Sequence, residues 1–286
     1  MSHRVALITD STSDIPAEWV KQYDITIVPL SIIFGSQVYL DGVDMAPVEF
    51  YERLLNDPQT IPTTSQPTPS AFLEAYQKAA AKGAEEILVI TISGAMSGTI
   101  VSAQRAAEES PIPVHILDGK SNSMGIGWQV IAAARVREAG GSLEDMMAVA
   151  EKVRPNVAYY ISLDTITYLS KGGRIGDALK LLNSVLKIKP LIYVNPNTGT
   201  VGASIPARSR ASAIEGMYKE FFKHIRTDLP MHITVLHNNA LEEAQALAAR
   251  VREEFNPVEM FISIVSPTLG VHTGPRAIAL CGYAEM

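Results

Sequence analysis

Two hydroxyl-rich segments of the chain each stand directly before a predicted helix. Residues 62–67 read PTTSQP and residues 93–99 read SGAMSGT. The N-terminus of a helix offers unpaired backbone N–H groups and a partial positive charge, so hydroxyl groups gathered there suit an anion. No residue near either segment in sequence is a general base that would turn one of these hydroxyls into a nucleophile. The pattern therefore predicts first a place for a small anionic headgroup, and only second a catalytic centre.

Ordinary helix capping would also account for the hydroxyls of either segment alone. In the second segment, Gly98 lets a backbone N–H come close to a ligand, and Ser97 and Thr99 can donate hydrogen bonds to a carboxylate or phosphate. Thr64 and Ser65 are the matching residues of the first segment. Two such segments in one half of the chain favour anion binding over capping alone.

Glycines flank His272 in the sequence GVHTGP, between two predicted strands. This pattern indicates a shaped loop rather than core, and an imidazole there can donate a hydrogen bond to an anion. A surface-loop histidine without a role is the alternative. The six histidines are dispersed, so no histidine and cysteine cluster has the spacing of metal ligands.

A basic tract covers residues 171–210. It holds seven basic residues and one acid, a net charge of +6 in a chain whose total is −6. Such asymmetry indicates a docking face for an acidic partner, a phosphate or an anionic membrane surface, although scattered surface charge is the usual alternative. The Gly-Gly pair before Arg174 favours a functional role. The basic residues are Lys171, Arg174, Lys180, Lys187, Lys189, Arg208 and Arg210.

Composition excludes several classes of protein. The 286 residues are 47% hydrophobic and 19% charged, which is typical of a globular protein, and the pI near 5.6 disfavours a nucleic-acid binder. The single cysteine, Cys281, excludes an intramolecular disulfide and fits a cytoplasmic location. We expect neither a signal peptide nor a membrane span, because no apolar run is long enough.

Strands alternate with helices along the chain, which predicts an α/β protein. Expected strands cover residues 5–9, 25–33, 38–40, 87–92, 114–117, 157–163, 191–194, 201–205, 232–236, 261–265 and 277–283. Expected helices cover residues 47–55, 69–83, 99–109, 127–139, 177–186, 209–225 and 241–255, with a further helix that begins near Pro16 and is capped by Asp14.

The pattern divides the chain into two domains. Residues 1–155 are expected to form an N-terminal parallel-sheet, Rossmann-like domain with an irregular insertion at about 34–62. Residues 156–286 are expected to form a mixed α/β domain, because a turn sequence at 195–199 indicates a hairpin. Ligands of parallel sheets bind at the carboxyl ends of the strands, where residues 10–14 and 93–99 both lie.

The chain resembles the DegV family, which includes the fatty-acid-binding FakB subunits of bacterial fatty acid kinase. The resemblance covers nearly the whole chain, and its strength comes from the order of several modest motifs. These motifs are DSTSD at 10–14, PTTSQP at 62–67, SGT at 97–99, LSKGGRI at 169–175, KIKP at 187–190, RSR at 208–210 and GVHTG at 270–274. Ile100, Gly119 and Arg276 depart from the residues usual in the family.

The resemblance implies a carrier without catalytic residues, metal or cofactor, which holds a long-chain fatty acid in an internal tunnel. The resemblance implies an acid of about 14–18 carbons, such as palmitate. Each buried methylene contributes about 0.8 kcal/mol, so we expect the acyl chain to set the affinity. Family residues carried over to this chain give a carboxylate site of Thr64, Ser65, Ser97, Gly98, Thr99 and His272. The implied partner is a separate fatty acid kinase subunit of the DhaK/DhaL type, docked at Arg174 and Lys171, with transient contact to a membrane surface and no nucleic acid.

Two other functions remain open from the residues themselves. One is a hydrolase or acyltransferase with Ser97 or Ser65 as nucleophile and His272 as base, since serine and histidine occur in the same set of residues. The other is a lipid-sensing regulatory protein that acts through the basic face.

Overall fold

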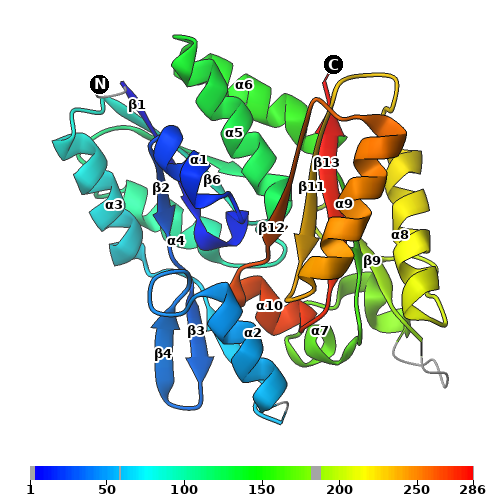
Figure 1. Cartoon of the computed structure of the whole chain (residues 1–286). Helices are drawn as coiled ribbons and strands as arrows, with labels where there is room; N and C mark the ends of the chain where they lie inside the picture. The colour runs from blue at the N-terminus through cyan, green and yellow to red at the C-terminus, as the bar shows by residue number, and fades with distance from the viewer. Residues whose placement is uncertain (1–3, 58, 182–187, 286) are drawn as a thin grey trace.

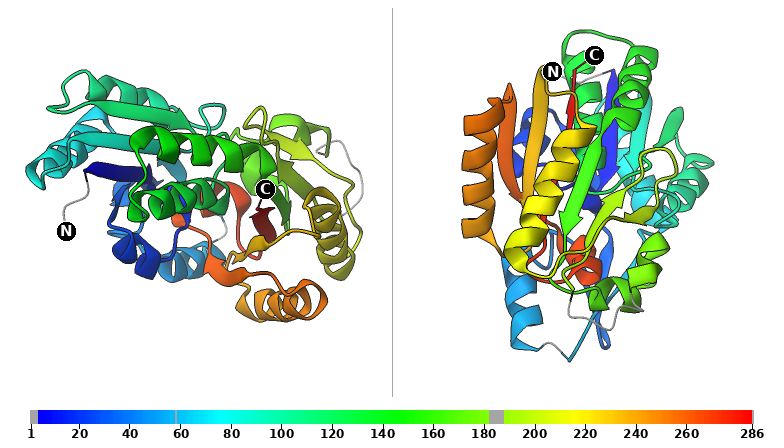
Figure 2. Two further views of the ribbon diagram at one scale, coloured as in Figure 1. Left: turned by 90° about the horizontal axis from the view of Figure 1, so that it is seen from above. Right: turned by 90° about the vertical axis from the view of Figure 1, so that its right-hand side faces the viewer.

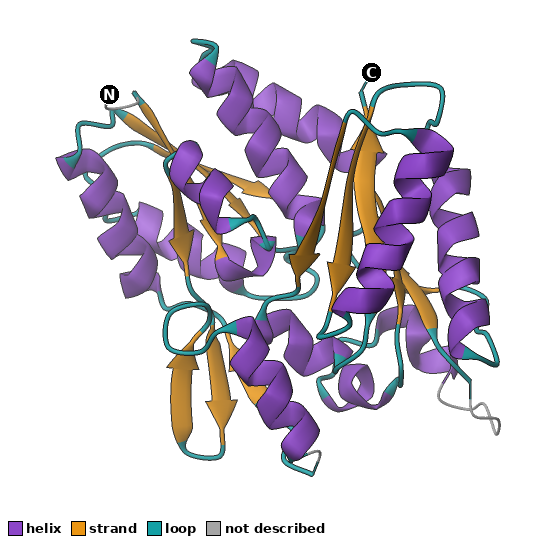
Figure 3. Ribbon diagram, viewed as in Figure 1, coloured by secondary structure: helices purple, strands orange, loops and turns teal. Residues whose placement is uncertain are grey.

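The fold was examined in a computed structural model that describes residues 4–57, 59–181 and 188–285. Two β-sheets lie side by side with helices packed on them, and a small third sheet lies below the first (Figure 1). Figure 3 separates helices from strands in the same view. None of the helices in the described ranges is long and apolar enough to cross a membrane.

The first sheet has four parallel strands in the order β2-β1-β6-β7. Both of its faces are covered by helices, which is why its strands are rich in buried aliphatic residues. Its strands are β1 Val5–Asp10, β2 Ile25–Val28, β6 Glu86–Thr91 and β7 Val114–Asp118. One face packs on α3 (Pro69–Ala81) and α4 (Thr99–Ala107), and the other on α1 (Ala17–Gln22), α5 (Met124–Glu138) and α6 (Leu143–Val153).

The second sheet has six strands in the order β10-β9-β8-β13-β11-β12, and only β11 and β12 pair in parallel. Its strands are β8 Ala158–Ser162, β9 Leu191–Val194, β10 Val201–Ala203, β11 Met231–His237, β12 Glu259–Ile264 and β13 Ile278–Ala284. Helices α8 (Arg210–His224) and α9 (Leu241–Phe255) cover one face (Figure 2). The other face packs against α5, which thereby contacts both large sheets. The α/β class, with a parallel sheet followed by a mixed sheet, is therefore confirmed.

The third sheet is formed by residues 31–34, 37–40 and 63–65, of which only 37–40 lies wholly inside the segment of about 34–62 that we expected to be irregular. The strand predicted over 25–33 is in fact two strands, β2 and β3 (Ser31–Phe34), because Pro29 between them has no N–H to donate to a ladder. The hairpin strand β4 (Gln37–Leu40) and the helix α2 (Pro47–Asn56) were both expected. The TTS sequence, predicted as a loop, forms β5 (Thr63–Ser65), which pairs antiparallel with β3.

Three further differences bear on the site. His272 was predicted in a loop, but it lies in a short helix, α10 (Pro267–Thr273), and the short helix α7 (Thr167–Lys171) was not expected. The helix predicted over 177–186 is a 3-10 helix, η3 (Gly176–Leu181), and the remainder of that prediction falls outside the described residues. Asp14 does not cap α1; it ends the 3-10 turn η1 (Ser11–Ser13), and its carboxylate bonds elsewhere.

Candidate functional site

A cavity of about 450 Å³ lies between the two large sheets. Its apolar wall is formed by core residues whose side chains alternate along the strands of the second sheet. These are chiefly Tyr159, Ile161, Ile192, Val194, Val201, Leu236 and Ala279. The volume falls within the range of about 300–1,000 Å³ that is typical of small-molecule sites.

Polar side chains from distant segments meet on another part of the cavity wall. Thr64 on β5 and His272 on α10 are joined by a hydrogen bond of 3.0 Å between Thr64 Oγ1 and His272 Nε2. They are 208 positions apart in sequence, and antiparallel pairing of β5 with β3 places Thr64 on the face that points toward α10. The structure therefore brings together two residues that the sequence singled out separately.

Burial keeps the His272 imidazole uncharged. Burial, and secondly the positive charge of Arg174, lower the pKa of His272 to about 4, so the ring is neutral at pH 7. Its Nδ1 atom is buried and has no hydrogen-bond partner among the described residues. A proton on Nδ1 would therefore have no acceptor, which favours the tautomer that carries its proton on Nε2. In that tautomer Nε2–H donates to Thr64 Oγ1, and the hydroxyl proton of Thr64 is free for a ligand.

Gly172, directly after α7, makes room for the His272 ring. A Cβ atom at position 172 would lie 2.1 Å from His272 Nδ1. The backbone φ of Gly172 is −74°, which any residue can adopt, so space is the reason for the glycine. Sequence analysis treated the Gly-Gly pair only as a signal for docking and missed this role.

Ser97 lies on the cavity wall at the start of α4. Its hydroxyl is 2.8 Å from Thr99 Oγ1 and accepts a hydrogen bond from the Thr99 backbone N–H at 3.3 Å. Thr99 itself is fully buried behind Ser97 and does not line the cavity. Gly98 lines an adjoining cavity of about 410 Å³ instead. Of the hydroxyl groups in the second predicted segment, that of Ser97 is thus the one that a ligand in the cavity can reach.

Ser65 and Gln66 complete the wall contributed by the first predicted segment. Ser65 is exposed at the end of β5, and Gln66 Nε2 donates to Ser102 Oγ on α4 at 3.0 Å. This bond ties the two hydroxyl-rich segments to each other. Sequence analysis did not single out Gln66, because a glutamine in a loop carries no pattern of its own.

Arg174 lies beside the same polar residues. It lines the cavity and donates to the Gly172 carbonyl at 2.8 Å and to the Met96 carbonyl at 3.4 Å. A chain of contacts thus runs from Thr64 through His272, Gly172 and Arg174 to the residue before Ser97, which places the polar groups on one side of the cavity. Lys171 is exposed nearby.

The rest of the basic tract is partly neutralised by acids outside it. Lys189 pairs with Asp164 at 2.6 Å, and Arg210 pairs with Glu243 at 2.8 Å. The side chains of Lys180 and Lys187 lie outside what the structure describes. Among the basic residues whose side chains are described, Arg174 lines the cavity and Lys171 lines a neighbouring one.

The geometry does not form a nucleophile and base pair. His272 bonds to Thr64 rather than to Ser97 or Ser65, and no carboxylate within the described ranges orients its Nδ1. The hydrogen-bond partner of the Ser97 hydroxyl is Thr99. In the part of the chain that the structure describes, no cluster of three or more His, Cys, Asp or Glu residues could hold a metal ion.

Comparison with known proteins gives matches over the full length of the chain. A family model described as an uncharacterised protein of the DegV family matches residues 4–285. A DegV domain-containing protein of Streptomyces coelicolor is 34% identical over 281 residues, which cover 98% of both chains. One from Deinococcus radiodurans is 32% identical over 280 residues, which cover 96% of this chain and 97% of the relative.

Solved structures of similar proteins have the same fold. A DegV family protein from Thermus thermophilus, described as binding fatty acid, superposes with a TM-score of 0.89 at 30% identity, over 99% of this chain and 100% of the other. DegV from Bacillus subtilis, described as a fatty acid binding protein, has a TM-score of 0.90 at 28% identity with the same coverage. A stearic-acid-binding protein from Eubacterium ventriosum has a TM-score of 0.89 at 25% identity, over 98% of each chain.

Proposed function

The chain belongs to the DegV family, and we propose that its cavity binds a long-chain fatty acid whose carboxylate lies against Thr64, Ser65, Ser97 and His272. The observation that carries this proposal is the cavity of about 450 Å³, which combines a wall of aliphatic side chains with a set of polar residues in which Thr64 and His272 are hydrogen-bonded. An amphiphile with one small acidic group matches such a wall.

The acyl chain supplies most of the affinity in this proposal. Burying about 14 methylenes gains roughly 11 kcal/mol before the cost of association, whereas a hydrogen bond to a charged group nets only about 1.5–3 kcal/mol. The polar residues therefore set the orientation of the ligand, with the carboxylate near Arg174 and the chain along the second sheet.

Titration of delipidated protein with palmitate and with hexadecanol tests this assignment. Both ligands carry the same chain, so both should bind, and palmitate should bind more tightly. His272→Ala should weaken the binding of palmitate but not that of hexadecanol, because hexadecanol has no carboxylate for the headgroup site to hold. Equal loss for the two ligands, or no loss for either, would contradict the headgroup site.

The carrier further presents the carboxylate to a separate fatty acid kinase subunit, which makes the acyl phosphate from ATP. What supports this step is the adjoining cavity of about 410 Å³, which shares Ser97 and Arg174 with the ligand cavity and gives a route to the carboxylate from outside. Arg174 is exposed at this cavity, Lys171 is exposed at a neighbouring one, and the two residues form the proposed docking site.

The second step is measured as the rate of acyl phosphate formation when the loaded carrier is mixed with ATP and a kinase subunit of the DhaK/DhaL type. Arg174→Glu should slow the transfer when the rate is taken per mole of bound fatty acid, a correction that is needed because Arg174 also lines the ligand cavity. Lys223→Glu, at an exposed lysine on α8, is the matched control and should have no effect. Equal rates for all three proteins would remove Arg174 from the docking site.

A further inference from the structure

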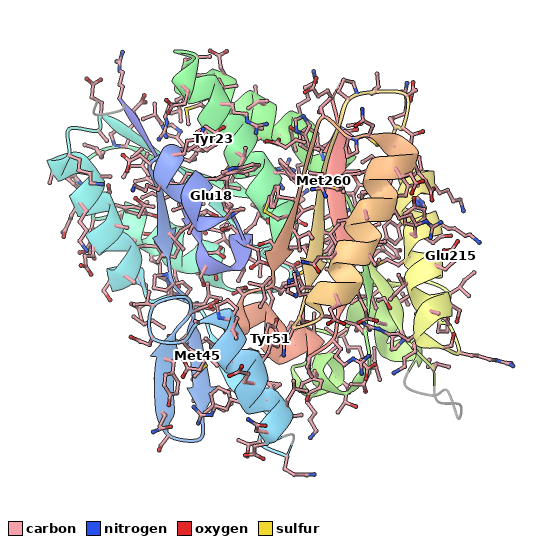
Figure 4. The ribbon with its side chains drawn as sticks, in the orientation of Figure 1. Glu18, Tyr23, Met45, Tyr51, Glu215 and Met260 are labelled. Atoms are coloured by element: carbon pink, nitrogen blue, oxygen red, sulfur yellow. The ribbon has the colours of Figure 1, made fainter. Side chains whose placement is uncertain are left out.

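The helix that carries His272 is too short to hold its own position. α10 has seven residues, and a helix of two turns is not stable without tertiary contacts. Residues of α2, α7, β3 and β5 surround it. Tyr51 on α2 donates to the Val265 carbonyl just before α10 at 3.0 Å, and Figure 4 shows Tyr51 where these two helices meet. The place of His272 therefore depends on what fixes the two ends of α10.

Asn238 fixes the C-terminal end of α10. It follows β11 and is only 1% exposed. Its Nδ2 atom donates to Thr273 Oγ1 at 2.7 Å and to the Gly274 carbonyl at 2.6 Å. These are the two residues directly after His272. A buried amide is costly unless it is hydrogen-bonded, so this side chain holds the end of α10 in one place.

Asp14 fixes the N-terminal end from the other half of the chain. Its Oδ1 atom accepts a hydrogen bond from the backbone N–H of Ser266, which precedes α10, at 2.9 Å. Its other carboxylate oxygen accepts from Ser123 Oγ at the start of α5. The Asp14 carbonyl also accepts from Ser263 Oγ at 3.2 Å. One buried residue thus connects α10 with two segments of the first half of the chain.

We propose that Asn238 and Asp14 are positioning residues, which clamp the two ends of α10 so that His272 stays in hydrogen-bonding contact with Thr64. The His272 ring has little freedom, with Thr64 at 3.0 Å on one side and Gly172 closely packed on the other. A small shift of α10 would break the bond to Thr64. The consequence for fatty acid retention rests on the proposed function, whereas the clamp itself does not.

Replacement of Asn238 by leucine tests the C-terminal end. Asn238→Leu keeps the branched shape of the side chain but removes both N–H donors. Gln129→Met is the matched control, because Gln129 is also 1% exposed and donates to two backbone carbonyls, of Gly119 and Gly125, without touching α10. NMR of the imidazole nitrogens in ligand-free protein reports the His272 environment. Asn238→Leu should shift the His272 signals and Gln129→Met should not. Because Asn238 also lines the ligand cavity, the His272 signals of ligand-free protein decide the test, and not the rate of fatty acid release.

A pair of variants at Asp14 tests the N-terminal end of α10. This pair also tests the proposed clamp if Asn238→Leu does not fold. Asp14→Asn keeps an acceptor for the Ser266 N–H and should leave the His272 signals in place, whereas Asp14→Ala should shift them. His272 signals that match the wild type in both Asn238→Leu and Asp14→Ala would overturn the proposal. Shifted signals in a protein that binds no fatty acid would uphold the clamp and refute the proposed ligand.

Discussion

In the proposed fatty acid site, His272 acts as a neutral group. Because burial lowers its pKa to about 4, the ring cannot form an ion pair with a carboxylate at pH 7, and it acts instead through Thr64, whose hydroxyl it orients by hydrogen bonding. The positive charge at the site belongs to Arg174, which is exposed and placed nearer the entrance. Orientation of the carboxylate and attraction of an anion are thus separate tasks of separate residues.

Thr64→Val tests the polar contact with the least change in shape. It removes one hydroxyl that bonds His272 and faces the cavity, so fatty acid release should be roughly 10- to 100-fold faster, from a loss of about 1.5–3 kcal/mol. Thr63→Val is the control, because Thr63 lies on the opposite face of β5. Stopped-flow transfer of a fluorescent fatty acid to vesicles gives the rates. Identical rates for Thr63→Val and Thr64→Val would remove Thr64 from the site.

Gly172→Ala should displace His272 without disturbing the backbone. The added Cβ would stand 2.1 Å from His272 Nδ1, and the φ of −74° suits alanine. Fatty acid occupancy of the purified protein should fall, while the thermal midpoint changes little. Gly216→Ala in α8, where the nearest atom would be 3.8 Å from the new Cβ, should keep full occupancy. Full occupancy in Gly172→Ala would show that the position of the ring is not critical.

At the scale of elements, the candidate site depends on short helices and strands that the hydrophobic periodicity of the sequence does not predict. Alternation of strands and helices predicted the parallel sheet and most of the second half correctly. It missed α10, because a seven-residue segment that contains Gly270 and ends before Gly274 has the composition of a loop. It missed β5, because three polar residues become a strand only by pairing with β3. Pro29 was the one visible signal that the strand over 25–33 would break.

The candidate site was predictable in its residue types but not in its geometry. The hydroxyl-rich segments and His272 were found from the sequence, and the family resemblance gave them one shared role. Asn238 and Gly172 carry no motif that points to His272, since their roles arise from contacts over long stretches of sequence. Such contacts are visible only once α10 has been placed.

The Asp14 carboxylate, which links the start of α5 with the residue before α10, should make the free energy of unfolding depend on pH. Burial raises the pKa of Asp14 to about 7, helped by the neighbouring carboxylate of Asp41, whose pKa is raised to about 6. Tyr51, Tyr159 and Cys281 also face Asp14, and burial raises their pKa values, so they stay neutral. Between about pH 4 and 7 the folded protein holds a proton that the unfolded chain releases, so the free energy of unfolding falls as the pH rises.

Asp14→Asn should remove that contribution. Thermal midpoints of the wild type and of Asp14→Asn, measured from about pH 4.5 to 7.5, should differ in slope, with the wild type losing more stability toward pH 7.5. The comparison cancels groups that titrate alike in both proteins, whereas Asp41, which interacts with Asp14, is part of the difference. Parallel curves for the two proteins would contradict the raised pKa of Asp14.

At the scale of the whole molecule, the two halves are joined by a polar and aromatic seam. Arg135 on α5 makes two hydrogen bonds to Glu259 on β12, at 2.7 and 2.9 Å, and His232 contacts the same carboxylate at 2.7 Å. Trp19 from the first half packs edge-on against Phe261 of the second, with ring centroids 4.7 Å apart. The cavity between the sheets therefore has walls that are fixed relative to each other.

Arg135→Met should loosen that seam. The pair with Glu259 is partly buried, so its loss should lower the free energy of unfolding by about 1–2 kcal/mol, less than for a fully buried pair. Arg226→Met is the control, because Arg226 pairs with Asp228 at the surface, and its effect should stay within about 0.5 kcal/mol. Urea unfolding measures both. Equal effects would mean that the seam adds nothing to stability.

Mass spectrometry of organic extracts from untreated protein, purified from a bacterial host, tests the central claim most directly. We expect one long-chain fatty acid per protein chain, of about 14–18 carbons, because the apolar wall gains free energy with each buried methylene. Extracts without lipid, or with a lipid that lacks a free carboxyl group, would contradict the assignment of the cavity to a fatty acid.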